Sequence, residues 1–363
     1  MDDSSLKEWT ADELLAELRR RERVTAAKGG EEDSRNRTAP VSSPGRSREL
    51  ENVPTSELAK AAQDRQRVIY GSDNRKDLYQ VKSQKVQASA NAVVALVKTS
   101  DLARENDGSY RLATEQYSEA YQLCGSEPFV SQPIGCFCSG FLVAPDVVAT
   151  AGHCVKNQAD LSNIRFVFGF RMTDAEHARA NFPANDVYAG ASLIGRQLAQ
   201  DGTDWALVRL DREVVGRKPV QYRTAGKISN TQSLFVIGHP SGLPQKYAPG
   251  AKVRDNAPVP FFVANLDTYG GNSGSPVFNA SNGKVEGILV RGENDFVSNG
   301  SCYISMVCPT TGCRGEDVTR STMWGTKIPK TKTSSSSVAP KPRKSGGKTA
   351  KGRTVAGRAL KRR

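Results

Sequence analysis

Short apolar runs recur through the middle of the chain, and turn residues such as Ala144-Pro-Asp146 and Ser281-Asn-Gly283 separate several of them. Long amphipathic helices do not alternate with these runs, so the pattern predicts an all-β barrel or sandwich. A helical excursion is expected only near Thr173–Ala180. The expected strands are Ala92–Lys98, Phe141–Ala144, Val147–Ala151, Ile164–Phe170, Trp205–Leu210, Leu234–Ile237, Phe261–Asn265, Pro276–Phe278 and Val285–Val290.

The first 66 residues have a different character and form a charged N-terminal extension. Thr10-Ala-Asp-Glu13 resembles a capping box, and apolar residues near helical spacing predict a short amphipathic helix there: Leu6, Trp9, Leu14, Leu15 and Leu18. Residues 29–56 are rich in Gly, Ser, Pro and charge and are expected to be disordered. Residues 57–66 could form a second short helix. The extension is expected to be a pro-segment or an adaptor.

The C-terminal tail, residues 327–363, carries the whole net charge of the protein. It holds 13 Lys and Arg and no acidic residue, which leaves 38 basic residues elsewhere against 38 Asp and Glu. Almost no large apolar residue occurs there, so the tail is expected to be disordered. It could bind nucleic acid or an acidic partner through its charges, or act only as a solubilising or targeting extension. The predicted domain between the two ends is residues 67–326.

Composition excludes several other classes. The chain has 363 residues, 37% of them apolar, and no run approaches the roughly 18 apolar residues of a membrane-spanning helix. Residues 1–30 lack the basic start and apolar stretch of a secretory signal. The expectation is a cytoplasmic monomer that needs no cofactor or metal, with export by a non-conventional route as the alternative.

Three segments carry residues suited to nucleophilic chemistry. Thr150-Ala-Gly-His153-Cys154 follows a predicted strand, Asp204 opens another, and Gly270-Gly-Asn-Ser273-Gly-Ser-Pro276 precedes a third. A serine hydroxyl is a weak nucleophile that needs an adjacent base, imidazole suits that role, and a carboxylate fixes the imidazole tautomer. Each segment alone has an ordinary structural explanation. Together, in the order His, Asp, Ser on a β-rich background, they favour acyl transfer.

The motifs TAGHC (150–154), DWALVRL (204–210) and GGNSGSPVF (270–278) resemble those of trypsin-like serine proteases. The match is nearest to the bacterial glutamyl-endopeptidase branch, which has stretches similar to residues 68–79, 139–155 and 265–279. The resemblance covers roughly residues 67–320. It implies two antiparallel six-stranded β-barrels, a site in the cleft between them, and a serine endopeptidase that acts on protein or peptide substrates.

The resemblance also implies roles for individual residues. Ser273 would be the nucleophile, His153 the general base and Asp204 the acid that orients the base. The backbone N–H groups of Gly271 and Ser273 would form the oxyanion hole. Asp201 is a rival for the acid, because it lies three residues before Asp204.

The pocket for the residue before the scissile bond would be walled by residues 267–271 and 290–292. Asp267 would favour Arg or Lys substrates, although relatives with glutamate specificity also have an Asp-Thr pair there. Leu289 stands where those relatives have a His, which weakens an acidic preference, while an inward Arg291 would restore it. The primary specificity therefore stays open among basic, acidic and other. The predicted pocket residues are Asp267, Thr268, Leu289 and Arg291.

The seven cysteines are an odd number. The resemblance implies a disulfide between Cys138 and Cys154 beside the catalytic His. The other five could form further bridges, and a zinc site is the alternative. They are Cys124, Cys136, Cys302, Cys308 and Cys313.

An endopeptidase is thus the leading hypothesis. The alternatives are a catalytically silent module with a protease fold, and a protein that the basic tail localises to nucleic acid or an acidic surface.

Overall fold

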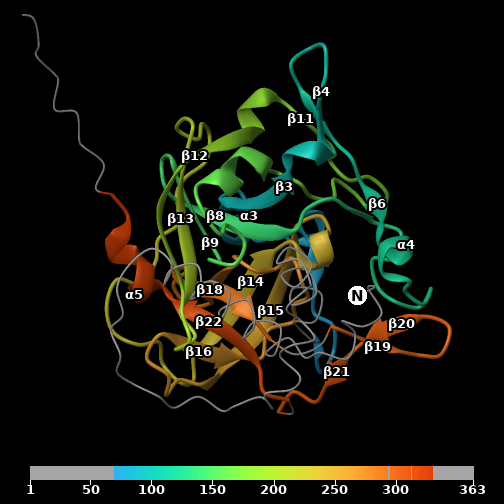
Figure 1. Ribbon diagram of the computed structural model, residues 1–363. Helices are drawn as coiled ribbons and strands as arrows, with labels where there is room; N and C mark the ends of the chain where they lie inside the picture. Colours follow the sequence, from blue (N-terminus) through green and yellow to red (C-terminus); the bar gives the residue numbers. More distant parts are fainter. Residues whose placement is uncertain (1–68, 293–294, 312, 330–363) are drawn as a thin grey trace, which may run out of the picture. The chain divides into compact units, whose positions relative to one another are not determined.

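Six antiparallel strands close the first β-barrel in the computed structural model, which describes residues 69–292, 295–311 and 313–329 (Figure 1). The ring closes because β3 pairs with both β8 and β10. Around the barrel, the strands are β10 (Ile164–Phe168), β12 (Val187–Leu198), β13 (Asp204–Leu210), β9 (Val147–Thr150), β8 (Cys138–Ala144) and β3 (Val93–Lys98).

A second antiparallel barrel follows in the sequence. It also has six strands, and pairing between its first and last members closes it. In order they are β14 (Ser233–Gly238), β17 (Pro276–Asn279), β18 (Val285–Arg291), β22 (Glu316–Arg320), β16 (Phe261–Ala264) and β15 (Lys246–Asp255). The short strand β2 (Lys76–Asp77) extends this sheet at β15. The all-β, two-barrel prediction is confirmed.

Short elements decorate the barrels. The strand β1 (Ile69–Tyr70) pairs in parallel with β21 (Val307–Cys308). The other small sheets are β4 (Leu102–Arg104) with β5 (Tyr110–Leu112) and β11 (Asn181–Phe182), β6 (Glu115–Gln116) with β7 (Pro133–Ile134), and β19 (Phe296–Ser298) with β20 (Tyr303–Ser305). The described α-helices are α3 (Gln84–Ala90), α4 (Tyr117–Tyr121) and α5 (Ser321–Trp324). Within the described ranges, no helix has the length and apolar character required to cross a membrane.

Alternation along the strands explains why the strand runs are apolar at consecutive positions. In β14, Leu234 and Val236 pack in the core of the second barrel. Phe235 and Ile237 face the other way, into a cluster that continues into the first barrel. Successive side chains of a strand point to opposite faces of the sheet. A strand buried on both faces therefore lacks the alternation of apolar and polar residues in its sequence. This shared apolar cluster joins the two barrels into one structural unit.

All nine predicted strands are present, with ends shifted by a few residues. The helix predicted near Thr173–Ala180 is wrong. The Asp174 carboxylate accepts the backbone N–H groups of Glu176 and His177 and bends the chain into a turn, and Met172 forms a β-bridge with Ala178. The predictions for residues 1–66 and for nearly all of the tail lie outside the described residues.

Candidate active site

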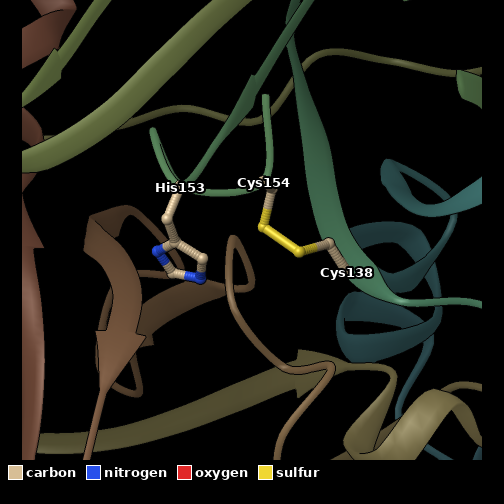
Figure 2. A group of neighbouring side chains, drawn as sticks. All are labelled: Cys138, His153 and Cys154. Atoms are coloured by element: carbon tan, nitrogen blue, oxygen red, sulfur yellow. A yellow bond between two sulfur atoms is a disulfide. The ribbon is translucent and has the colours of Figure 1, made fainter. Parts of the chain in front are cut away.

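The first part of the site is the turn that follows β9. His153 lies in this turn, and the next residue, Cys154, forms a disulfide with Cys138 at the start of β8. Figure 2 shows His153 and Cys154 on the same short loop, with the disulfide joining Cys154 to Cys138 on the neighbouring strand. Thr150, at the end of β9, donates its hydroxyl to the carbonyl of Ser139 at 2.7 Å. One covalent and one hydrogen-bonded link thus hold the histidine loop to β8.

Asp204, the first residue of β13, holds this loop from the other side. Its Oδ2 lies 2.7 Å from Nδ1 of His153. Its Oδ1 accepts the backbone N–H groups of Gly152, at 2.5 Å, and of His153, at 3.2 Å. The carboxylate therefore orients the imidazole directly and also fixes the backbone that carries it.

The charge state of Asp204 fits this role. Burial alone would raise the pKa of this carboxyl, but the charge and hydrogen bond of His153, the Arg291 guanidinium and the Gly152 N–H together hold the pKa below its ordinary value. Asp201, the rival acid, is exposed, and its carboxylate accepts the backbone N–H of Thr203 at 2.8 Å. The structure thus brings Asp204, and not Asp201, to the imidazole.

Ser273 lies in a tight turn between β16 and β17 and is only 2% exposed. Gly271 and Gly274 on either side have φ values of +81° and +90°, a region that side chains disfavour. A Cβ at Gly274 would lie 2.0 Å from the carbonyl oxygen of Ser139, so no larger residue fits there without a shift. The turn is therefore pressed directly against β8 of the first barrel.

Ser139, which sequence analysis did not single out, fixes this contact. Its backbone N–H donates to the Ser273 carbonyl at 2.8 Å, and its hydroxyl donates to the Gly271 carbonyl at 2.9 Å. The same hydroxyl accepts the backbone N–H of His239 at 3.0 Å. Cys138 and Ser139 are neighbours, so adjacent residues of β8 hold both the histidine loop and the serine turn.

The Nε2 atom of His153 is buried and has no hydrogen-bond partner within the described part of the chain. The hydrogen bond between this atom and the Ser273 hydroxyl, which nucleophilic catalysis needs, is therefore not formed in this conformation. Such bonds are often long or misaligned in the absence of substrate. The acid and the base of the candidate triad are in contact, and the serine is held beside them by its backbone.

The four predicted pocket residues, Asp267, Thr268, Leu289 and Arg291, are all buried. Both oxygens of Asp267 accept backbone N–H groups, from Tyr70 at 2.8 Å and from Asn74 at 3.3 Å. Burial raises the pKa of Asp267 to about 6, partly offset by these two bonds. Asp267 thus holds the segment that contains β1.

Leu289 and Arg291 also have structural partners. Leu289 is fully buried in the core of the second barrel. Arg291 donates to the Asp317 carboxylate and to the carbonyl of Gly202, both at 2.7 Å. Because Gly202 lies in the loop before Asp204, Arg291 supports the acid and does not present a free cation to substrate. The Thr268 hydroxyl donates a hydrogen bond to the carboxylate of Glu316, with the two oxygens 3.2 Å apart.

The cysteines resolve into three disulfides and one free thiol. Besides Cys138–Cys154, the pairs are Cys124–Cys302 and Cys308–Cys313, and Cys136 is free. The zinc alternative therefore has no thiolate ligands at those four positions. Ligand atoms of Cys138, His153 and Cys154 lie within 4.8 Å of one another, but the two sulfurs are joined to each other.

Part of the chain is similar to a known protein family. Residues 138–288 match the trypsin-like peptidase domain model. The central part of the chain is thus similar to trypsin-like peptidases. The match spans both β8, with the disulfide and Ser139, and the serine turn.

Two curated proteins are similar to part of this chain. The chain is 27% identical to the glutamyl endopeptidase of Bacillus licheniformis over 166 aligned residues. The aligned region covers 43% of this chain and 49% of that protein. The chain is 30% identical to the secreted RxLR effector protein 73 of Plasmopara viticola over 170 aligned residues. This aligned region covers 41% of this chain and 40% of that protein. The chain thus spans half or less of the length of these relatives.

Solved structures of proteases are also similar. A Glu endopeptidase in complex with MPD is 20% identical, with 70% of this chain and 96% of that chain covered and a TM-score of 0.39. The VesB protease of Vibrio cholerae is 16% identical, with 72% and 67% covered and a TM-score of 0.43.

Proposed function

We propose that this protein is a serine endopeptidase in which Ser273, His153 and Asp204 form the catalytic triad. The observation that carries the proposal is the set of three hydrogen bonds between Asp204 and the histidine loop. They involve Nδ1 of His153 and the backbone N–H groups of Gly152 and His153. A carboxylate placed in this way selects the tautomer with the proton on Nδ1. It leaves Nε2 as the base, which is the arrangement that a serine nucleophile requires.

The reaction would proceed in two stages. The Ser273 hydroxyl attacks the peptide carbonyl carbon and gives its proton to Nε2 of His153. The resulting oxyanion is stabilised by the backbone N–H groups of Gly271 and Ser273, and loss of one such donor costs about 10²–10³ in turnover. The C–N bond then breaks as His153 protonates the leaving amine. Water, activated by the same imidazole, hydrolyses the acyl-enzyme and regenerates Ser273.

Hydrolysis of an unstructured protein substrate by purified enzyme tests this function. Wild-type protein should cleave it, while Ser273→Ala and His153→Ala should each lose activity by about 10⁴-fold or more with an unchanged circular dichroism spectrum. A folded but inert wild type would favour the alternative, a silent module with a protease fold.

We also propose that the protein works in an oxidising compartment. Six of its seven cysteines form disulfides, and disulfides persist mainly outside the reducing cytosol. The cytoplasmic expectation is therefore the less favoured one. Thiol counts on protein purified from its own cells test this point: one reactive thiol after denaturation supports it, and seven contradict it.

The basic tail is proposed to hold the protein on a polyanionic surface. The support is its composition, 13 Lys and Arg without an acidic residue. Deletion of residues 330–363 should leave the hydrolysis of a small peptide unchanged and remove salt-dependent retention on heparin. Retention that survives the deletion would assign polyanion binding to another part of the chain.

A further inference from the structure

Residues 269–272, just before the candidate nucleophile, form a turn whose conformation sets the direction of one peptide group. The Asn272 N–H donates to the Tyr269 carbonyl at 3.1 Å and closes the turn. Gly271 has a φ of +81°, whereas Gly270 lies outside the left-handed region, and this is the pattern of a type II turn. In a type I turn the peptide between the two central residues is turned over. Such a flip would replace the Gly271 N–H, an expected oxyanion donor, by the Gly270 carbonyl.

Two glycines at the centre of the turn allow both conformations at little cost, so contacts from outside the turn decide between them. Ser241 makes one such contact, because its backbone N–H donates to the Gly270 carbonyl. A Cβ built on Gly271 would lie 2.7 Å from the His239 carbonyl oxygen and 2.7 Å from the Gly242 nitrogen. The loop 239–243 therefore lies directly against the turn and bonds a carbonyl that a flipped peptide would direct elsewhere.

The other polar groups of the two glycines support the same arrangement. The Gly270 N–H donates to Oδ2 of Asp295 at 2.8 Å. The Gly271 carbonyl accepts the Ser139 hydroxyl at 2.9 Å. Three of the four backbone polar groups of these glycines are thus bonded to the protein. The fourth is the Gly271 N–H, which the proposed mechanism assigns to the oxyanion.

Ser241 itself has a backbone conformation that side chains rarely adopt. Its φ of +52° and ψ of +20° lie in the left-handed region, and the residue is buried. Its hydroxyl accepts a hydrogen bond from the Tyr117 hydroxyl, with the two oxygens 3.1 Å apart. Burial raises the pKa of Tyr117 above its ordinary value, so this hydroxyl stays protonated and remains a donor. The bond fixes the side chain of the residue whose N–H reaches the Gly270 carbonyl.

Tyr117 is anchored by contacts outside the serine turn. It is the first residue of α4, and it packs with Leu123 and Leu243 in one buried cluster. Leu243 belongs to the loop 239–243, so this cluster joins the α4 segment to the loop. The Cys124–Cys302 disulfide ties the same segment to the hairpin of β19 and β20, beside which α4 lies in Figure 1. The Tyr117 hydroxyl is therefore presented to Ser241 from a firmly held segment.

We propose that Tyr117, acting through Ser241, is a positioning residue that keeps the turn 269–272 in the form that presents the Gly271 N–H to the oxyanion. This inference rests on the proposed endopeptidase function. Without the Tyr117 hydroxyl, Ser241 loses the side-chain bond that fixes it in the left-handed region, and its N–H leaves the Gly270 carbonyl. The turn then populates the flipped form, in which one of the two oxyanion donors is missing.

The experiment compares Tyr117→Phe, Ser241→Ala and the double variant with wild type on a fluorogenic peptide that wild type cleaves. Each single variant should lower kcat about tenfold with KM within about twofold, because the oxyanion forms only in the transition state. The double variant should resemble either single variant, because both changes break one hydrogen bond. Tyr188→Phe is the matched control. It removes another buried hydroxyl, which accepts the Val215 N–H at 3.4 Å, and should keep the wild-type kcat.

A peptide aldehyde and the corresponding peptide alcohol distinguish a positioning role from a general weakening of the site. The Ser273 oxygen adds to the aldehyde carbon and its proton passes to His153, so the aldehyde oxygen becomes an oxyanion that needs the Gly271 N–H. The alcohol forms no bond to Ser273. In Tyr117→Phe, inhibition by the aldehyde should weaken about tenfold, while inhibition by the alcohol should stay unchanged.

The outcomes separate this inference from the proposed function. If wild type is active and both single variants keep its kcat and its affinity for the aldehyde, the positioning role is overturned and the endopeptidase proposal stands. Equal weakening of both inhibitors would also overturn it, since that result indicates a loss of fold. If wild type neither cleaves peptides nor binds the aldehyde, the endopeptidase proposal fails and the positioning role fails with it. Should Tyr117→Phe not fold, the same measurements on Ser241→Ala decide.

Discussion

The backbone N–H of Ser139 donates a hydrogen bond to the carbonyl of Ser273, with nitrogen and oxygen 2.8 Å apart. Ser139 belongs to the first barrel and Ser273 to the second. The preceding residue, Cys138, is joined to Cys154 beside the candidate base. One end of β8 therefore sets the position of the nucleophile relative to the base, although neither reactive group lies on this strand.

Ser139→Ala should reduce both stability and turnover. The change removes a hydroxyl that donates to the Gly271 carbonyl and accepts the His239 N–H, and it leaves two buried polar groups unpaired. Each such group costs about 1–3 kcal/mol. We expect a lower denaturation midpoint and a fall in kcat of roughly tenfold, since the oxyanion donors shift with the turn. Ser100→Ala, at an exposed serine, is the control and should change neither quantity.

The acid assignment predicts a sharp contrast between two neighbouring aspartates. Asp204→Asn should lower kcat by about 10⁴-fold, because an amide stabilises the wrong imidazole tautomer. Asp201→Asn should stay within a few-fold of wild type, because this exposed carboxylate accepts the Thr203 N–H and does not contact the imidazole in the part of the chain that the structure describes. Steady-state kinetics on both variants measure the contrast, and a crippling effect of Asp201→Asn would reverse the assignment.

Two buried groups predict opposite effects on the pH dependence of stability between about pH 4 and 6. Burial lowers the pKa of His239 to about 4, despite its hydrogen bond to the Leu243 carbonyl. The unfolded state then binds the extra proton, so this residue makes stability rise with pH. The pKa of Asp267 is raised to about 6, so the folded state binds the extra proton and stability falls with pH.

Urea denaturation at several pH values separates these two contributions. Relative to wild type, His239→Asn should flatten the rise of unfolding free energy with pH over this range. Asp267→Asn should steepen it. Each slope changes by at most about 1.4 kcal/mol per pH unit, the value for one proton. Slopes that move in the same direction in the two variants would contradict the burial of one of these groups.

The disulfide beside His153 predicts a structural requirement for activity. It closes a loop across a sequence separation of 16 residues, for which chain entropy predicts about 3 kcal/mol of stability. The double variant Cys138→Ala, Cys154→Ala should therefore melt at a lower temperature and lose turnover more than it loses affinity, since the base is less well positioned. Cys136→Ser is the control, because this cysteine is free. Equal kinetics in the double variant and wild type would show that Asp204 alone positions the base.

Nine of the twelve barrel strands were predicted from their apolar runs, and three were not. The three barrel strands missed were β12, β15 and β22. β12 is partly exposed and contains glycines, and β15 contains Pro249 and Gly250. The whole of β22 is buried, yet its sequence is Glu-Asp-Val-Thr-Arg. Asp317 pairs with Arg291, and the Thr319 hydroxyl accepts the Asp204 N–H, so tertiary partners make burial of these polar residues tolerable.

The same limit applies to the candidate site. The three candidate catalytic residues lie in short motifs whose spacing and neighbouring residues can be recognised from the sequence. They are His153, Asp204 and Ser273. Ser139 contacts Gly271, Ser273 and His239, all of them distant in sequence, and nothing near Ser139 in the chain marks these partners. Asp267 shows the converse: its distance from Ser273 suggested a pocket residue, whereas its oxygens bind backbone N–H groups of a segment 193–197 residues earlier.

The central claim, that Ser273 is a nucleophile activated by His153, is tested most directly by covalent labelling. Purified enzyme is treated with a fluorophosphonate, and the modified residue is mapped by mass spectrometry of its peptides. The account predicts one adduct, on Ser273, that forms in wild type, fails to form in Ser273→Ala, and forms far more slowly in His153→Ala. A folded wild-type protein without an adduct, or an adduct on another serine that persists in Ser273→Ala, would contradict it.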